Sequence, residues 1–181
     1  ICSGAWTNAM RGQHALATTP ISYQGVNAYS RIDDTRFDDN LDVINDPSIK
    51  IVTIDGESAE TIAKSDFPKA STVQLPQLTS GSEMLVNVMT RKGDVAFVDR
   101  HVGAEFMQAN PGKLKQVQAE FPLRLFGNAI WVKQGEFALQ NALNVATFQL
   151  LNTGKIEKIL KNNEVYPGTF YRAAKSFDVI K

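Results

Sequence analysis

The sequence predicts an α/β protein with a parallel-dominated sheet and crossover helices. Residues 49–99 contain three short apolar runs that end in polar residues, and two amphipathic segments lie between them. This alternation is typical of parallel strands joined by helices. A strand pattern leads into this block at Val26–Arg31, and another leads out of it at Leu125–Val132. Two such crossing strands form a hinge, so we expect two lobes with a ligand cleft between them.

The part of the chain before this block alternates weakly and contains several helix-capping residues. Phe37, Leu41 and Ile44 have helical spacing, and Pro47 stops the pattern. The expected elements are a strand ending at Cys2, a loop at Ser3-Gly4, a helix capped by Thr7 or Asn8 and ending at His14, a strand at Val26–Arg31, and a helix at Phe37–Asn45.

Within the block, Ser58 follows the first apolar run and is a favoured helix N-cap. Glu57 and Glu60 suit the positive end of the same helix. The expected elements are a strand at Lys50–Ile54, a helix from Ser58 with Ile62, Ala63 and Phe67 buried, a strand at Ser71–Leu75, a helix capped by Ser80 or Ser82 with Leu85, Val88 and Met89 buried, and a strand at Val95–Val98 before Asp99.

The clearest helical pattern follows the block, at Phe137–Leu151, and Gly154 breaks it. Its apolar residues on one side are Leu139, Ala142, Leu143, Ala146 and Leu150. The other expected elements after the block are a helix at His101–Asn110, strands at Leu114–Val117 and Leu123–Val132, and a helix at Lys155–Asn162.

Composition excludes several classes of protein. The 181 residues are 43% hydrophobic and 21% charged, as in ordinary globular proteins. Lys plus Arg equals Asp plus Glu, at 19 each, so the chain has no electrostatic footprint for nucleic acid. No apolar run approaches the ~18 residues of a membrane helix. The single cysteine, Cys2, is either a reactive thiol or a small apolar residue at the end of a buried strand, and we favour the second interpretation.

Motifs for catalysis, metals and cofactors are absent from the sequence. His14 and His101 are isolated and lack metal-ligand spacing. The five acids at positions 33, 34, 38, 39 and 42 lack the glycine and the terminal glutamate of a calcium loop, so we interpret them as a solvated helix face. We therefore predict no catalytic residue, no metal site and no cofactor.

The sequence fits a binding site for a small zwitterion better than it fits a catalytic or metal site. The planar fork of Arg11 suits a carboxylate, and Ser58 with nearby backbone N–H groups also favours an anion. Asp99, at a strand end, can accept hydrogen bonds from an ammonium group. The alternatives are a surface salt bridge for Arg11 and a helix cap for Asp99.

Four stretches of the chain carry a resemblance to a known family. Ser3–Arg11 resembles an S-S-x-S-x-T-x-x-R loop, and Gly56–Glu60 resembles a G-T-T-x-E segment. Lys92–Asp99 resembles an x-G-x-x-D-A-x-x-x-D region, one residue tighter after the glycine. Gln140–Leu160, with Thr153–Ile156, resembles a closing helix pair with a D-G-T-x-x-K-I turn. The chain is similar to the solute-binding proteins of ABC-type amino-acid uptake transporters, which have the type II periplasmic binding protein fold.

The resemblance implies which residues bind the ligand. Arg11 and Ser58 would hold its α-carboxylate, and Asp99 would hold its ammonium group. Four further residues in the matching loops are expected to line the site, namely Ser3, Gly4, Trp6 and Gly56. Gly4 and Trp6 depart from the serines of the family loop, so Trp6 either stacks on the ligand side chain or packs in the core.

The resemblance also implies an organisation and a function. Residues 1–28 and 130–181 would form a partial lobe 1, and residues 29–129 would form lobe 2. The family's usual N-terminal part of lobe 1 has no counterpart here, so we expect the natural chain to continue upstream, with a signal peptide, or another chain to complete the lobe.

The expected protein is periplasmic or extracellular, bacterial, and at the membrane-associated face. It would deliver an amino acid to a membrane permease without spanning the membrane itself. Two rivals share the fold: a ligand-sensing module of a signalling protein, and a dehydratase-like enzyme that uses Glu57 as general acid.

Overall fold

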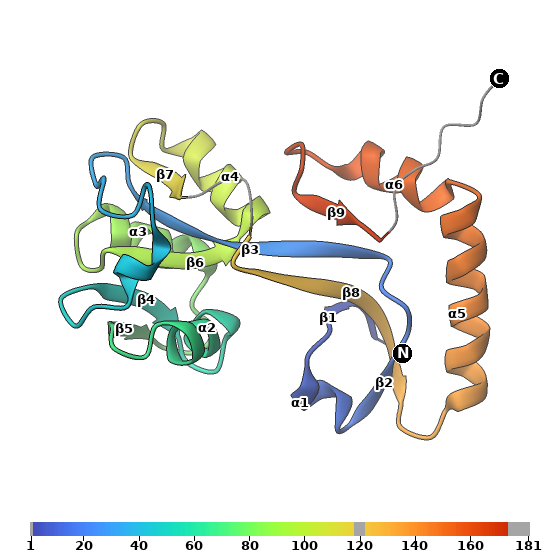
Figure 1. The fold of residues 1–181 in the computed structure, drawn as a ribbon. Helices are drawn as coiled ribbons and strands as arrows, with labels where there is room; N and C mark the ends of the chain where they lie inside the picture. The colour runs from blue at the N-terminus through green and yellow to red at the C-terminus, as the bar shows by residue number, and fades with distance from the viewer. Residues whose placement is uncertain (1, 118–121, 174–181) are drawn as a thin grey trace. The chain divides into compact units, whose positions relative to one another are not determined.

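The computed structural model of the protein describes residues 2–117 and 122–173. The chain divides into two units. Unit 1 comprises Ile1–Gly25 and Leu125–Lys181, and unit 2 comprises Val26–Arg124. Two long strands, β3 (Ser22–Arg31) and β8 (Arg124–Lys133), carry the chain from one unit into the other (Figure 1).

The sheet of unit 2 has a parallel centre. β4 (Lys50–Ile54) pairs in parallel with β5 (Ser71–Leu75) on one side and with β6 (Val95–Asp99) on the other. β3 runs antiparallel to β6 and to β7 (Leu114–Val117). β4 and β6 are almost continuously apolar because helices cover both of their faces. The predicted α/β class with crossover helices is therefore confirmed, and the sheet as a whole is mixed and partly parallel rather than parallel-dominated.

Three helices supply this cover: α2 (Ser58–Asp66), α3 (Gly81–Met89) and α4 (Arg100–Ala109). α2 packs on β4 and β6, where the ring of Phe67 lies 5.4 Å from that of Phe97. Burying an aromatic or aliphatic side chain of this size stabilises the fold by about 1.5–3 kcal/mol. Ser80 caps α3, as predicted, by accepting a hydrogen bond from the Glu83 N–H at 3.2 Å.

The sequence predicted Ser58 as the N-cap of α2, but the N-cap is the preceding residue. Glu57 occupies the N-cap position without a side-chain hydrogen bond, and Ser58 is the first helical residue. Gly56, with φ of +75°, makes the turn that precedes it. This backbone conformation suits glycine because it has no Cβ.

The predicted helix at Phe37–Asn45 is wrong, because only a 3-10 turn, η1 (Leu41–Ile44), forms there. Phe37 and Ile44 are both fully buried, so the helical spacing reflected two anchors of an irregular loop. The interpretation of the acids as a solvated helix face is also wrong for Asp34, which is buried.

A buried guanidinium explains the position of this loop. Arg31 Nη2 donates to Asp34 at 3.0 Å and to Asp94 at 3.1 Å, and Nη1 donates to the carbonyls of Val88 and Gly93. Arg36 donates to the same two carboxylates at 2.6 Å. This ion-pair network ties the end of β3 to the start of β6.

Unit 1 has a smaller, antiparallel arrangement. β1 (Cys2–Trp6) and β2 (Ala15–Ala17) pair with β8, and β9 (Phe170–Arg172) pairs with the first residues of β3. The helices are α1 (Ala9–Gly12), α5 (Phe137–Asn152) and α6 (Lys155–Asn163). The sequence predicted α5 and α6 to within a residue, but it predicted neither β2 nor β9, which are each three residues long.

Two expectations for the first residues are wrong. The predicted loop at Ser3-Gly4 lies inside β1, which carries a register shift between Cys2 and Ala5. Gly4 has φ of +75°, so the chain bulges and stays paired. Cys2 is exposed rather than at the end of a buried strand.

We predict that Asp34→Ala lowers the free energy of unfolding by about 2–4 kcal/mol, because it leaves a buried arginine short of a carboxylate. Urea denaturation at neutral pH measures this loss. The control is Asp33→Ala, whose exposed pair with Arg91 is worth about 0–1 kcal/mol. Equal losses in the two variants would contradict the assignment.

We also predict that the ion pairs of Asp34 and Asp94 with Arg31 and Arg36 lose their stabilising effect in acid. Hydrogen bonding from Arg36 lowers the pKa of Asp34. Burial raises the pKa of Asp94, but hydrogen bonds from Arg36, the Lys50 N–H and Arg31 outweigh it and lower that pKa overall. Carboxyls with lowered pKa stabilise the fold above about pH 4 and lose this effect as the pH falls through their folded values. The deficit of Asp34→Ala should therefore shrink in acid, and a constant deficit would argue against the ion pairs.

Candidate functional site

The carboxyl ends of β4 and β6 form the candidate site of unit 2. These adjacent parallel strands end at the same edge of the sheet, so the turn at Gly56, the start of α2 and Asp99 lie along one edge. Ligands in open α/β sheets bind outside such carboxyl ends. The structure thus brings together three residues that the sequence predicted for one site.

Hydrogen-bond donors are available at the start of α2. Among the described residues, the N–H groups of Ser58 and Ala59 have no acceptor, and neither has the Ser58 hydroxyl. Unsatisfied first-turn N–H groups and the helix dipole favour an anion at this place. The Gly56 N–H is already used, because it donates to the Glu60 carboxylate at 2.8 Å.

Asp99 is both a helix cap and a partly unsatisfied carboxylate. Its Oδ1 accepts a hydrogen bond from the His101 N–H at 2.7 Å and caps α4. Its Oδ2 is buried and has no partner among the residues that the structure describes. Burial raises the pKa of Asp99, against the lowering effect of hydrogen bonds from the His101 and Val102 N–H groups. A cationic donor at Oδ2 would relieve this unpaired charge.

Besides the start of α2 and Asp99, this edge carries the carboxamide of Gln77, which the sequence alone did not assign to it. The carboxamide of Gln77, in the turn after β5, lies over the Gly56 backbone, so that a Cβ on Gly56 would meet Gln77 Nε2 at 3.6 Å. No described residue hydrogen-bonds this carboxamide. Gly56 follows β4 and Gln77 follows β5, and these two turns are neighbours only because β4 and β5 pair in parallel. The strand order is therefore needed to predict that Gln77 lies at this edge.

The predicted site residues of unit 1 lie in β1 and α1. Ser3, Gly4 and Trp6 belong to β1, and Arg11 belongs to α1. Arg11 is exposed, and its Nη1 donates to the Trp6 carbonyl at 2.7 Å. It forms no ion pair within the described part of the chain, so the surface salt-bridge alternative has no partner there. Its remaining N–H groups can bind a carboxylate.

Trp6 packs against protein in this structure. Its ring stacks on that of Phe126 with centroids 4.8 Å apart, and its Nε1 donates to Gln24 Oε1 at 2.6 Å. Asn128 donates to the same oxygen at 2.9 Å. Sequence reasoning missed the two partners of Trp6, Phe126 and Gln24, because they come from strands far away along the chain.

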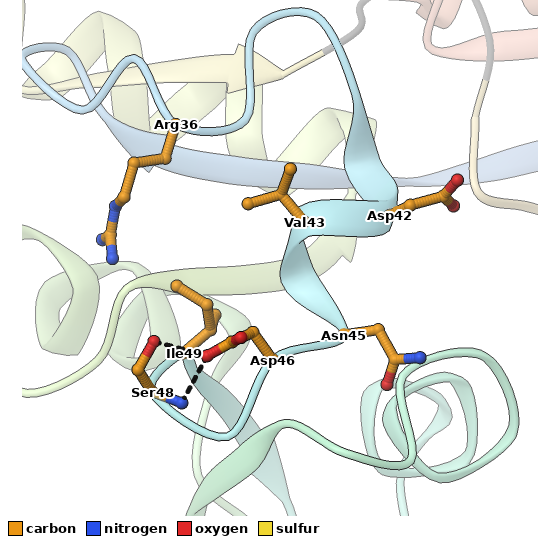
Figure 2. Close-up of a pocket in the computed structure, with 7 residues that line it drawn as sticks. All are labelled: Arg36, Asp42, Val43, Asn45, Asp46, Ser48 and Ile49. Atoms are coloured by element: carbon orange, nitrogen blue, oxygen red, sulfur yellow. Dashed lines mark hydrogen bonds between the residues drawn. The ribbon is translucent and has the colours of Figure 1, made fainter.

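A pocket of about 370 Å³ lies at the other end of β4 (Figure 2). Its carboxylate Asp46 is satisfied by the Ser48 N–H and hydroxyl, at 2.8 and 2.6 Å. Arg36, on its wall, is held by Asp34 and Asp94. The pocket precedes β4 and is separate from the edge that carries Ser58.

Residues 2–117 and 122–173 contain neither a cluster of metal ligands nor a helix that could span a membrane. No group of three or more His, Cys, Asp or Glu side chains in these residues is placed to hold a metal ion. Within the same residues, no helix combines the length and the apolar character needed to cross a bilayer.

No protein-family model matches the sequence, and no curated protein matches it by sequence. Solved structures do match the fold. A putative binding component of an ABC transporter from Wolinella succinogenes, complexed with lysine, superposes with a TM-score of 0.77 at 20% identity, covering 91% of this chain and 69% of that chain. The chain has the type II periplasmic-binding-protein fold.

Two further solved structures support this assignment. An ancestral amino-acid-binding protein, described as a precursor of cyclohexadienyl dehydratase, gives a TM-score of 0.71 at 19% identity over 88% of this chain. An amino acid ABC transporter substrate-binding protein from Streptococcus pneumoniae, bound to L-arginine, gives 0.69 at 17% identity over 88%. The chain spans 65% of the length of each of these two proteins. Fold likeness at this identity does not transfer an activity.

We predict that Asp99→Asn raises the melting temperature at neutral pH. Asparagine keeps the α4 cap but removes the buried charge. Because the folded pKa of Asp99 is raised, the native state loses stability as the pH rises from about pH 4 through that pKa. Calorimetry should show the advantage of Asp99→Asn at neutral pH and its disappearance in acid. A lower melting temperature at neutral pH would contradict the unpaired charge.

Proposed function

We propose that the protein is an extracytoplasmic solute-binding protein that captures a small amino acid or a related zwitterion. The main observation in support is that hydrogen-bond donors and an acceptor carboxylate lie at the same sheet edge of unit 2. The free donors at Ser58 suit a carboxylate. The Asp99 carboxylate, whose Oδ2 is buried without a partner among the described residues, suits an ammonium group once ligand binding turns that oxygen toward the site. A free α-amino acid presents both groups on one carbon.

Unit 1 would contribute further contacts to the same ligand. In this proposal, Arg11 forms a bidentate pair with the ligand carboxylate, and the bulge at Ser3 and Gly4 gives the ligand access to backbone. Trp6 keeps its stack on Phe126 and borders the ligand side chain. The two units close over the ligand, because contacts made only in the closed form shift the population toward it.

The closed form would then be presented to the permease of an ABC transporter, on the periplasmic or outer face of a bacterial membrane. This step rests on the likeness to transporter-binding components. A ligand-sensing module of a signalling protein would use the same grip, with a signalling partner in place of the permease.

The dehydratase alternative has weaker support from the site. It needs a general acid held against the substrate, and Glu57 is the candidate. Its side chain is exposed and makes no cap hydrogen bond in the structure. A general acid is normally held against its substrate by burial or by neighbouring groups, and the described residues provide neither at Glu57.

We predict that Arg11→Ala and Asp99→Ala each weaken amino-acid binding by about 2–5 kcal/mol, because each leaves a ligand charge without its partner. Ser58→Ala removes one hydrogen bond and should cost about 1 kcal/mol. Titration calorimetry with lysine, arginine, glutamine and glutamate measures these losses.

The matched controls are Arg91→Ala and Asp38→Ala, two exposed charges of unit 2 that lie away from this edge. They should leave the affinity unchanged. Unaltered affinity in both Arg11→Ala and Asp99→Ala would overturn the assignment. Turnover of prephenate or arogenate by the purified protein would favour the enzyme instead.

A further inference from the structure

The turn between β4 and α2 uses a side chain to hold its central peptide. The Glu57 N–H donates to the Ile54 carbonyl at 3.1 Å and closes a β-turn. Gly56, at the third position of this turn, has φ of +75°, as a type II turn requires. The N–H of this glycine has no acceptor within such a turn. It donates instead to Glu60 Oε2, in the first turn of α2, at 2.8 Å.

The Glu60 carboxylate is itself held by two side chains. Gln74 Nε2, on β5, donates to Glu60 Oε1 at 3.1 Å and to Asp55 Oδ1 at 3.1 Å. Lys64 Nζ pairs with the same Glu60 oxygen, but its side chain is 71% exposed, whereas that of Glu60 is 15% exposed. Exposed ion pairs contribute little. The neighbouring strand therefore fixes the carboxylate beside the turn, and all four of these residues belong to unit 2.

The direction of the Gly56 peptide decides how the chain enters α2. A type II turn converts to a type I turn by rotation of its central peptide, and glycine adopts the backbone angles of both. An acceptor at the Gly56 N–H selects one of the two directions. The N–H groups of Ser58 and Ala59 come two and three residues later, and they are the donors without an acceptor among the described residues. Rotation of the peptide would move these donors as well.

We propose that Glu60 is the positioning residue of the candidate ligand site, because its carboxylate holds the Gly56 peptide in the direction that presents the Ser58 and Ala59 N–H groups to the ligand carboxylate. This role rests on the proposed function. Glu60 does not touch the ligand in this proposal, since both of its oxygens already accept hydrogen bonds inside unit 2. These donors also offset its negative charge beside an anion site.

The first test measures amino-acid binding by titration calorimetry with lysine, arginine, glutamine and glutamate. Glu60→Ala should weaken binding about tenfold or more, because it releases the Gly56 peptide. Glu60→Gln keeps an oxygen that accepts from the Gly56 N–H, and it should restore the affinity to within about threefold of wild type. The matched control is Glu83→Ala, which removes an exposed acid from the first turn of α3 and should change the affinity less than about twofold.

The second test follows the Gly56 N–H itself in the ligand-free protein. Hydrogen bonds from Lys64 and from the Gly56 N–H lower the pKa of Glu60. In NMR spectra, the Gly56 amide resonance should therefore shift as the pH falls through this lowered pKa. The carboxyls of Asp55 and Glu57 lie nearby in the chain, and both remain in Glu60→Gln. Loss of the shift in that variant assigns it to Glu60.

The outcomes separate this role from the proposed function. Unchanged affinity in Glu60→Ala would overturn the role of Glu60 alone, and so would a Glu60→Gln variant that binds as weakly as Glu60→Ala. A Gly56 resonance that titrates equally in Glu60→Gln would also overturn it. A wild-type protein that binds none of the four amino acids would overturn the proposed function, and this role with it.

Circular dichroism checks that each variant folds. If Glu60→Ala does not fold, Gln74→Ala replaces it, because it removes the donor on β5 that holds the carboxylate. Gln74→Ala should weaken binding about threefold or more. Wild-type affinity in this variant would overturn the role of Glu60.

Discussion

The parallel pairing of β4 with β5 and β6 is the constraint on which unit 2 depends. Parallel strands begin at one edge and end at the other, so helices must return the chain across the faces of the sheet. This is why α2 starts beside the end of β6 although Asp99 lies far along the chain. A register slip of one residue would expose the buried side of these strands. The register thus fixes both the core and the candidate site.

Two charged groups in unit 2 illustrate different roles for burial. The two terminal nitrogens of Arg31 donate to two carboxylates and two backbone carbonyls and hold a loop in place, while its Nε is buried without a partner among the described residues. Asp99 has one satisfied oxygen and one without a partner. Satisfied networks rigidify a fold, whereas an unsatisfied group is costly unless a ligand completes it. This partly unsatisfied carboxylate is what motivates the proposal that Asp99 binds the ammonium group of a ligand.

The two units differ in how they are held together. Unit 2 has a packed apolar centre with residues such as Tyr29, Phe37 and Leu85 fully buried. Unit 1 relies on strand pairing to β8 and on polar contacts between side chains and backbone, such as that of Gln140 with Ala17. Within the part of the chain that the structure describes, α5 carries no charged residue and exposes Phe137, Val145 and Phe148.

The sequence by itself determined the strand and helix order of unit 2, since apolar runs and amphipathic segments report local periodicity. It also singled out Ser58 and Asp99 as candidate ligand residues, because polar residues at strand ends are visible in order along the chain. It misjudged the loop around Phe37, and it missed β2 and β9. Those features depend on contacts between residues that are distant in sequence. Arg31 pairs with Asp94 beside the loop, and Gln140 donates to Ala17 in β2. Only the tertiary structure brings such partners together, and only it decided that Asp99 Oδ2 is buried without one.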